Sequence, residues 1–153
     1  GPINWFDWTL PQKNSELFQF CRRMIRFRSL HPALTHPLQA GDDREPGSSL
    51  EAVWHGTRPC LPDWSPGNRV LAFELRHRTE TGGSDVVYVA INTYWEPLEF
   101  VLPTPPSGCR WHIFANTGAP SPEDAYEPGE EPPRENQHDI QLGGRSMIAL
   151  VAR

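Results

Sequence analysis

The stretch Arg69–Pro103 constrains the fold more than any other part of the sequence, because it reads as consecutive β-strands. Val70–Leu75 alternates in polarity and predicts a strand with one buried face. Val86–Ile91 is apolar on both faces, as expected of a central strand that is covered from two sides. Thr79–Asp85 lies between them and contains two glycines, so an antiparallel hairpin with a loop of more than two residues should connect the strands. The residues predicted on the buried face of the first strand are Leu71, Phe73 and Leu75.

Frequent chain breakers favour short strands over long helices in the remaining sequence. The 153 residues include 17 Pro and 12 Gly, and 37% of them are apolar, which is enough for a core of ordinary size. The hairpin and the additional strands make about seven or eight strands in total. We therefore predict a mainly β fold, an antiparallel, Greek-key-like β-sandwich. The additional strands are expected at Pro37–Ala40, Leu50–His55, Leu98–Leu102, Arg110–Ala115, His138–Leu142 and Ser146–Ala152.

Asn14–Leu30 is the one convincing helix in the sequence. Asn14 or Ser15 can cap its start, and His31-Pro32 ends it. Apolar residues recur at helical spacing and predict a wide apolar stripe along the helix. The members of this stripe are Leu17, Phe20, Cys21, Met24, Ile25 and Phe27.

Four arginines crowd the last turns of this helix, where cations complement the helix dipole. The favoured interpretation is a solvated face or a set of ion pairs to a neighbouring domain, and the alternative is an anion site. The four residues are Arg22, Arg23, Arg26 and Arg28.

The first residues are unusually aromatic for the start of a chain. Trp5, Phe6 and Trp8 precede any regular element, whereas a free N-terminus is usually polar and frayed. This start resembles the middle of a larger protein, although Gly1-Pro2 could also be a cloning remnant.

The net charge and the cysteine content limit which binding partners and which cellular compartment are expected. The net charge of −5 argues against nucleic acid or an anionic membrane as the main partner, because both need a basic surface. Three cysteines without short spacing favour reduced thiols in an intracellular protein. We find no signal peptide and no apolar run long enough to span a bilayer, so we expect a soluble protein in the cytoplasm.

No catalytic or cofactor-binding motif stands out. The carboxylates cluster in loops, where turn chemistry and solvation are their usual role, and the six His and three Cys lack metal-ligand spacing, so neither a metal nor a cofactor is expected. The six tryptophans could stack on sugar rings if exposed, although most Trp in a sandwich lie in the core. The loop carboxylates are Asp42, Asp43, Glu45, Glu123, Asp124, Glu127, Glu130 and Glu131.

Several short motifs, taken together, resemble the C-terminal end of bacterial glycogen debranching enzymes, the isoamylase-type members of the α-amylase superfamily. The resemblance runs in collinear order over nearly the whole chain and is weakest in Thr117–Gln137. The motifs are Asn4-Trp5-Phe6-Asp7-Trp8, Phe27-Arg28-x-x-His31-Pro32-x-Leu34, Trp54-His55-Gly56, Pro62-Asp63-Trp64-Ser65, Arg69-Val70-Leu71-Ala72-Phe73, Val87-Tyr88-Val89-Ala90-Ile91-Asn92 and Arg145-Ser146-Met147-Ile148-Ala149-Leu150.

The resemblance implies that the chain is the tail of a larger hydrolase. In that family a (β/α)₈ barrel hydrolyses α-1,6 branch linkages of glycogen with an Asp nucleophile, a Glu acid and a second Asp, all upstream of this sequence. Residues 1–32 would be the end of the barrel, with Asn14–Leu30 as its eighth helix, and residues 33–153 the non-catalytic sandwich domain. Among the residues present, Asn4 and Trp5 would be the substrate contacts, since they fall in the loop after the eighth barrel strand.

Three interpretations of function follow. The leading one is a non-catalytic domain that stabilises the barrel of the same parent chain and helps to seat branched α-glucan. The second is an independent carbohydrate-binding module that uses exposed aromatic residues, and the third is an interaction domain unrelated to sugars. Without the barrel, we expect an exposed apolar patch and a tendency to form homodimers, unless the helix folds back onto the sandwich. This patch would comprise Leu17, Phe20, Met24 and Phe27.

Overall fold

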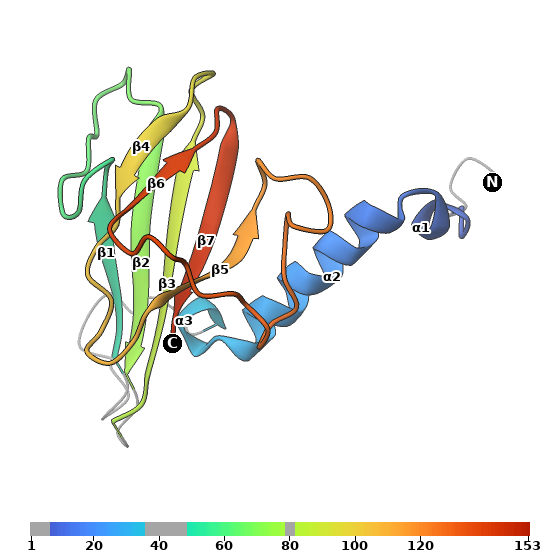
Figure 1. The fold of residues 1–153 in the computed structure, drawn as a ribbon, viewed down its shortest axis with the longest axis horizontal. Helices are drawn as coiled ribbons and strands as arrows, with labels where there is room; N and C mark the ends of the chain where they lie inside the picture. The colour runs from blue at the N-terminus through green and yellow to red at the C-terminus, as the bar shows by residue number, and fades with distance from the viewer. Residues whose placement is uncertain (1–6, 36–48, 79–81) are drawn as a thin grey trace.

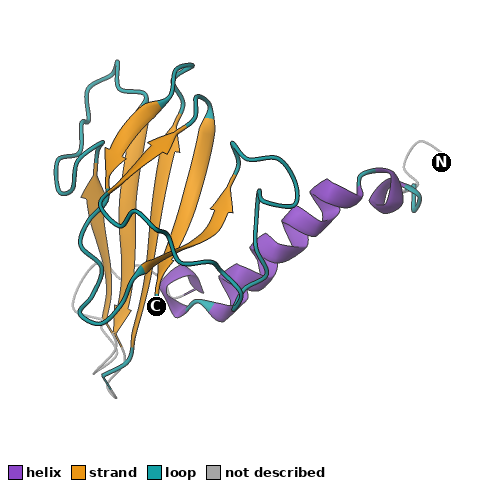
Figure 2. Ribbon diagram, viewed as in Figure 1, coloured by secondary structure: helices purple, strands orange, loops and turns teal. Residues whose placement is uncertain are grey.

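The computed structural model describes residues 7–35, 49–78 and 82–153 (Figures 1 and 2). Seven strands and three helices lie in these residues, and the strands hold more residues than the helices, as a mainly β fold requires. The helices are α1 (Leu10–Lys13), α2 (Ser15–Leu30) and α3 (Pro32–Thr35). The strands are β1 (Ser49–His55), β2 (Val70–Arg78), β3 (Ser84–Asn92), β4 (Leu98–Val101), β5 (Trp111–Asn116), β6 (Asp139–Leu142) and β7 (Ser146–Ala152).

The strands form two antiparallel sheets that face each other. The larger sheet has five strands in the order β1-β2-β3-β7-β5, and the smaller one pairs β4 with β6. The chain passes to the smaller sheet after β3 and again after β5, so the two sheets exchange strands as a sandwich does. The predicted hairpin is present, with Leu75 of β2 opposite Val87 of β3.

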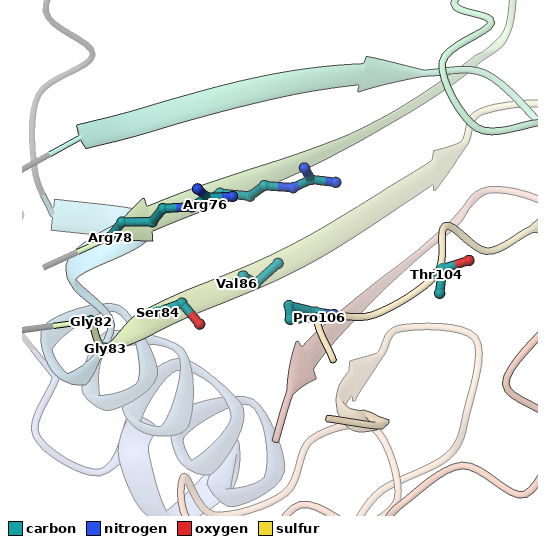
Figure 3. Close-up of a pocket in the computed structure, with 8 residues that line it drawn as sticks. All are labelled: Arg76, Arg78, Gly82, Gly83, Ser84, Val86, Thr104 and Pro106. Atoms are coloured by element: carbon teal, nitrogen blue, oxygen red, sulfur yellow. The ribbon is translucent and has the colours of Figure 1, made fainter. Parts of the chain in front are cut away.

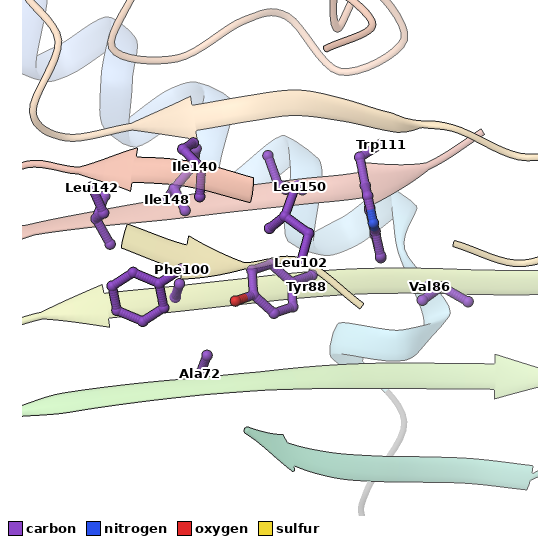
Figure 4. Packing of buried hydrophobic residues seen from close by; sticks show 11 residues of the cluster. Ala72, Val86, Tyr88, Phe100, Leu102, Trp111, Ile140, Leu142, Ile148 and Leu150 are labelled. Atoms are coloured by element: carbon purple, nitrogen blue, oxygen red, sulfur yellow. The ribbon is translucent and has the colours of Figure 1, made fainter. Parts of the chain in front are cut away.

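The main core fills the space between the two sheets (Figure 4). Tyr88 and Trp111 from the large sheet and Phe100 from the small one are fully buried there. Because burial of large apolar side chains is the main stabilising contribution in a sheet sandwich, this layer holds β4 and β6 onto the large sheet. The remaining members are Ala72, Val86, Ala90, Leu102, Ile140, Leu142, Ile148 and Leu150.

A second core lies on the opposite face of the large sheet, under helix α2. Phe27 stacks on Phe114 with ring centroids 3.6 Å apart, and both rings are buried. Phe114 is the extra residue of a bulge in β5, between Ile113 and Ala115, and a bulge redirects the side chain that it carries. Val87 of β3 belongs to this core whereas Val86 belongs to the first, which confirms that β3 is covered on both faces.

The predicted buried face of β2 is wrong. Leu71, Phe73 and Leu75 are only half-buried, while Ala72 and Glu74 on the other face are fully buried. The small sheet covers this second face, whereas Leu75 alone of the three predicted residues packs against the core under α2. A charged residue normally indicates the solvent side of a strand, and Glu74 lies inside because a cation accompanies it.

The predicted helix is confirmed, but two short helices flank it. Helix α2 ends at Leu30 as expected, and Pro32 then becomes the first residue of α3, a position that tolerates its missing N–H. Five predicted strands are found within one or two residues of their expected ends. Pro37–Ala40, the remaining predicted strand, lies outside the described residues.

Helix α2 folds back onto the sandwich with only part of its apolar stripe. Phe20, Met24 and Phe27 pack against the core on the large sheet. Leu17 and Ile25 remain exposed, as do Phe18 and the thiol of Cys21. In Figure 1 the helix leads away from the sheets toward the N-terminus. The exception named with the predicted patch therefore applies: the sandwich covers Phe20, Met24 and Phe27, and of the four predicted residues Leu17 remains exposed.

Candidate functional site

The two substrate contacts suggested by the family resemblance, Asn4 and Trp5, lie outside the described residues and stay a prediction. The tryptophans are the other sequence-based candidates. Trp111 is fully buried in the core, whereas Trp64 and Trp95 are 66% and 63% exposed. These two exposed rings lie in the loops 56–69 and 93–97, at the sandwich end where β1 and β3 finish and β2 and β4 begin. We refer to these two loops and the Trp54 side chain as the loop end.

The exposed rings of the loop end occur in pairs. Trp64 meets Trp54 edge to face, with ring centroids 5.6 Å apart. Tyr94 and Trp95 lie with their centroids 3.9 Å apart and their planes inclined at 31°. Each pair holds a large aromatic surface in contact with solvent, although burial would be favourable for rings of this size.

A surface cavity of about 370 Å³, lined largely by polar residues, adjoins the Tyr94 ring and the loop 56–69 that carries Trp64. Its wall includes the carboxylate of Asp63, the hydroxyl of Ser65, the guanidinium of Arg69 and the ring of Tyr94. Asp63 and Ser65 flank Trp64 in the sequence, and Tyr94 precedes Trp95. Hydrogen bonds from Ser65 lower the pKa of Asp63, so this carboxylate is ionised at neutral pH.

Two asparagines fix the backbone of the loop end. The Asn68 side-chain amide donates to the carbonyl oxygens of Asp63 and Val70, each at 2.6 Å. Buried Asn92 donates to the carbonyl of Glu96 at 2.9 Å and accepts from the Tyr94 N–H at 3.0 Å. The two loops are also joined to each other, because the N–H and hydroxyl of Thr93 both donate to the Arg69 carbonyl, at 2.8 and 2.9 Å.

Two glycines allow the backbone to approach itself closely at this end. A Cβ on Gly56 would overlap with the Leu61 carbonyl oxygen, and a Cβ on Gly144 would overlap with the carbonyl group of Trp95. The Arg145 N–H donates to the Tyr94 carbonyl at 2.8 Å, which ties the turn before β7 to the Tyr94–Trp95 pair. The loop end is therefore held in one conformation by contacts from several elements.

A buried ionic cluster lies deeper, between the sheets. Glu74 is 0% exposed, and its Oε2 accepts hydrogen bonds from the Arg76 guanidinium and lies 3.5 Å from Nε2 of buried His55. Burial lowers the pKa of His55, against the opposing attraction of Glu74, so the imidazole is neutral at pH 7. Burial also raises the pKa of the Tyr88 phenol, and Glu74 adds to this effect. The cluster explains how a strand with two charges can lie in the core.

Another cavity lies at the other end of the sheets, beside the β2–β3 hairpin (Figure 3). It measures about 450 Å³ and is lined by Arg76, Arg78, Ser84 and Thr104 among others. Because the guanidinium of Arg76 is bound to Glu74, its charge is already neutralised. One uncommitted arginine is a weak basis for an anion site, and we assign no ligand to this cavity.

The arginine cluster of α2 has a partner within the chain. Arg22, Arg23 and Arg26 each lie 3.2 Å from a carboxylate oxygen of Glu127, in the long loop 117–137. Arg23 also donates to the Ala125 carbonyl at 2.7 Å. Hydrogen bonding from Arg23, then from Arg22, lowers the pKa of Glu127 against the effect of desolvation. The expectation of ion pairs holds, but their acceptor is this loop, and Glu127 is not the free, solvated acid that the sequence suggested.

A second polar contact anchors the end of α2 to the sheet. Nδ1 of His31 lies 2.6 Å from Oδ1 of Asp85, and the Ala33 N–H donates to Oδ2 at 2.9 Å. Burial would raise the pKa of Asp85, but these hydrogen bonds and the charge of His31 outweigh it and lower the pKa. The carboxylate on β3 thus fixes the junction between α2 and α3.

The arrangement of acids does not suit glycoside hydrolysis within the described part of the chain. That chemistry needs two carboxyl groups facing each other across roughly 5 to 10 Å of open cleft. The buried acids are instead held by cations, Glu74 by Arg76 and Glu131 by Arg153 at 3.1 Å. Within residues 7–35, 49–78 and 82–153, no group of three His, Cys, Asp or Glu side chains could hold a metal ion. No helix in the same ranges is long and apolar enough to cross a membrane.

The sequence named the six tryptophans as possible sugar-stacking residues, but it did not indicate which of them are exposed or that Trp64 and Trp95 lie at the loop end. The pair Tyr94-Trp95 directly follows the core strand β3 and precedes a proline. Large aromatics at a turn, where chains normally place polar residues, are the signal that could have indicated an exposed site.

Comparison with known proteins places the chain among isoamylases. Residues 53–147 match the family described as "Isoamylase 1-3, C-terminal". The chain is 36% identical over 128 residues to isoamylase SU1, chloroplastic, of Zea mays. The aligned region covers 83% of this chain and 15% of that relative. It is 32% identical over 120 residues to the isoamylase of Pseudomonas amyloderamosa, covering 74% of this chain and 14% of the relative. The chain thus spans about one-seventh of the length of these relatives.

Proposed function

Because the chain belongs to the isoamylase C-terminal domain family, we propose that it is the non-catalytic C-terminal domain of a debranching enzyme that hydrolyses α-1,6 linkages of branched α-glucans. The observation that carries the proposal is the family match together with the small share of each relative that the chain spans. The catalytic acids would then belong to the part of the parent enzyme that this chain does not span.

The state of the carboxylates supports a structural role. Retaining or inverting glycosidases keep one carboxyl group protonated and a second one free to attack or to activate water. Here Glu74, Asp85 and Glu131 each face a positively charged or hydrogen-bonding partner that holds them in place. Asp63 is the one acid that lines the polar cavity of the loop end. A lone carboxylate there cannot supply both catalytic roles.

We further propose that the outer face of α2 docks on the catalytic barrel of the parent chain. Residues 1–32 would complete that barrel and residues 33–153 would form the separate sandwich. Phe18 and Ile25 are exposed apolar side chains on the side of the helix away from the sandwich, and Leu17 is exposed one turn before the residues that pack on it. Exposed apolar residues gathered on one helix face favour burial against another surface. A second copy of the chain is the alternative occupant, as the sequence-based homodimer interpretation holds.

The cellular setting is part of the same proposal. The cysteines at positions 21, 60 and 109 are free thiols, which suits the reducing cytoplasm, where glycogen breakdown would take place. Fractionation of the native cell with an antibody against the chain would test this, and recovery in an organelle or the periplasm would contradict it.

An activity assay tests the central proposal. Full-length parent enzyme should release reducing ends from glycogen, whereas the 153-residue chain alone should release none under the same conditions. Linear chains appearing with the isolated chain would contradict a non-catalytic role. Full-length protein that leaves glycogen intact while hydrolysing another bond would contradict the assignment to a debranching enzyme.

A further inference from the structure

We propose that the loop end of the sandwich is a docking site for a linear segment of α-1,4-glucan, with Trp64 and Trp95 as its stacking platforms. The identity of the sugar rests on the proposed function, because the polar and aromatic groups alone specify a carbohydrate rather than one particular glycan. The inference itself rests on what this end of the molecule exposes and how it is held.

The aromatic rings supply the main binding surface. A glucose ring presents its C–H groups on two faces, and an exposed indole or phenol ring offers a flat apolar surface against which such a face can pack. Trp64 and Trp95 remain about two-thirds exposed although each contacts a second aromatic ring. The two rings lie on separate loops, so the loop end offers two stacking surfaces and not one.

The polar cavity beside Tyr94 supplies directional contacts. Sugar hydroxyls act as donors and acceptors at once, so the groups that recognise them combine carboxylate, guanidinium and hydroxyl functions. Asp63, Ser65 and Arg69 line the cavity that adjoins both loops. One acid and one base leave the cavity close to neutral, which suits an uncharged polyol better than a phosphate or a polyanion.

The backbone of the site is ordered before any ligand arrives. Asn68 and Asn92 bind the carbonyls of their own loops, and Thr93 joins the two loops through the Arg69 carbonyl. The turn at Gly144 leaves no room for a side chain next to Trp95. Because the loops need little ordering on binding, weak stacking contacts can produce measurable affinity.

Gel retardation in native gels that contain glycogen tests the proposal on the full-length enzyme. The double variant Trp64→Ala/Trp95→Ala should bind glycogen roughly tenfold more weakly than the wild type, since two aromatic contacts are lost. The matched control is Trp64→Tyr/Trp95→Tyr, which keeps an aromatic ring at both positions and should retain most of the retardation. Thermal unfolding of all three proteins verifies that each is folded.

The possible outcomes separate the two proposals. Equal retardation of the alanine variant and the wild type would overturn the docking site. A tyrosine control that loses as much retardation as the alanine variant would overturn it too. If the alanine variant keeps its retardation but unfolds at a markedly lower temperature, another part of the parent chain covers these rings. This result would also overturn the docking site. Failure of the wild type to release reducing ends from glycogen, with retardation intact, would overturn only the debranching function.

Discussion

The two apolar faces of helix α2 differ in burial: one packs on the sandwich and the other is exposed to solvent. On the inner face, Phe20, Met24 and Phe27 pack onto the sheet, and Phe27 is 3% exposed. On the outer face, Phe18 and Ile25 also carry large apolar side chains, and they are 49% and 71% exposed. A surface helix of a globular domain normally has one apolar stripe, whereas this one is apolar over a much wider arc.

This difference indicates how much of the helix the sandwich can account for. The inner face has its partners in Phe114 and the neighbouring strands, so the sandwich alone explains those residues. The outer face has no partner among the described residues that would explain its composition. We attribute it to docking against the catalytic part of the parent enzyme, and substitutions on each face can break or sharpen this comparison.

The largest effect is expected on the inner face. Phe27→Ala removes a buried ring and its stacking partner contact, and should lower the free energy of unfolding of the 153-residue chain by about 3–5 kcal/mol. Chemical denaturation with urea measures it. A loss below about 1 kcal/mol, the size of an ordinary surface change, would mean that the helix does not pack on the sheet as described.

The contacts of Asp85 at the end of α2 should contribute less to the free energy of unfolding than Phe27 does, and their contribution should depend on pH. Asp85→Asn weakens the contacts to His31 and Ala33 and should cost about 1–3 kcal/mol at neutral pH. Because folding lowers the pKa of Asp85, its stabilising effect is present above the unfolded-state pKa near 4 and is lost as the pH falls through the folded-state value.

Urea denaturation of wild type and Asp85→Asn across roughly pH 3 to 7 checks both the size and the sign of this effect. The two stability curves should converge toward acid pH. A gap that stays constant, or that widens as the pH falls, would show that the ionised carboxylate is not what anchors α2.

A smaller effect is expected where the arginines of α2 meet the long loop. Glu127→Gln removes the shared acceptor of Arg22, Arg23 and Arg26, so the midpoint of thermal unfolding should fall slightly at low salt. The fall should shrink near 1 M NaCl, where the Debye length is about 3 Å. Glu123→Gln, an exposed acid of the same loop, is the matched control and should change nothing.

The smallest effect in the isolated chain is expected on the outer face. Ile25→Ala should change the stability of the 153-residue chain by no more than about 0.5 kcal/mol, because the side chain is already in solvent. In the full-length enzyme the same substitution should be clearly destabilising. If sedimentation shows instead that Ile25→Ala dissociates a dimer, a second copy and not the barrel covers this face.

The sequence predicted the sandwich class and helix α2 well, because hydrophobic period and Pro/Gly punctuation are local signals. It assigned the wrong buried face to β2, since no local pattern reveals that the half-buried Arg76 would pair with the buried carboxylate of Glu74. The partner of the α2 arginines, Glu127, is more than a hundred residues away, and a single sequence carries no sign of such a contact. The sequence also did not show that Trp64 and Trp95 lie at the same end of the sandwich, because only the fold brings the loops 56–69 and 93–97 together.

Thiol labelling tests the outer face most directly, because Cys21 lies on it and Cys60 lies in the loop end, and both are exposed. The rate of alkylation at each thiol, read by mass spectrometry of the peptides, can be compared between the 153-residue chain and the full-length enzyme. The account predicts that Cys21 reacts readily in the isolated chain and becomes protected in the full-length enzyme, while Cys60 stays reactive in both. Equal reactivity of Cys21 in the two proteins would contradict docking of α2 on the rest of the enzyme.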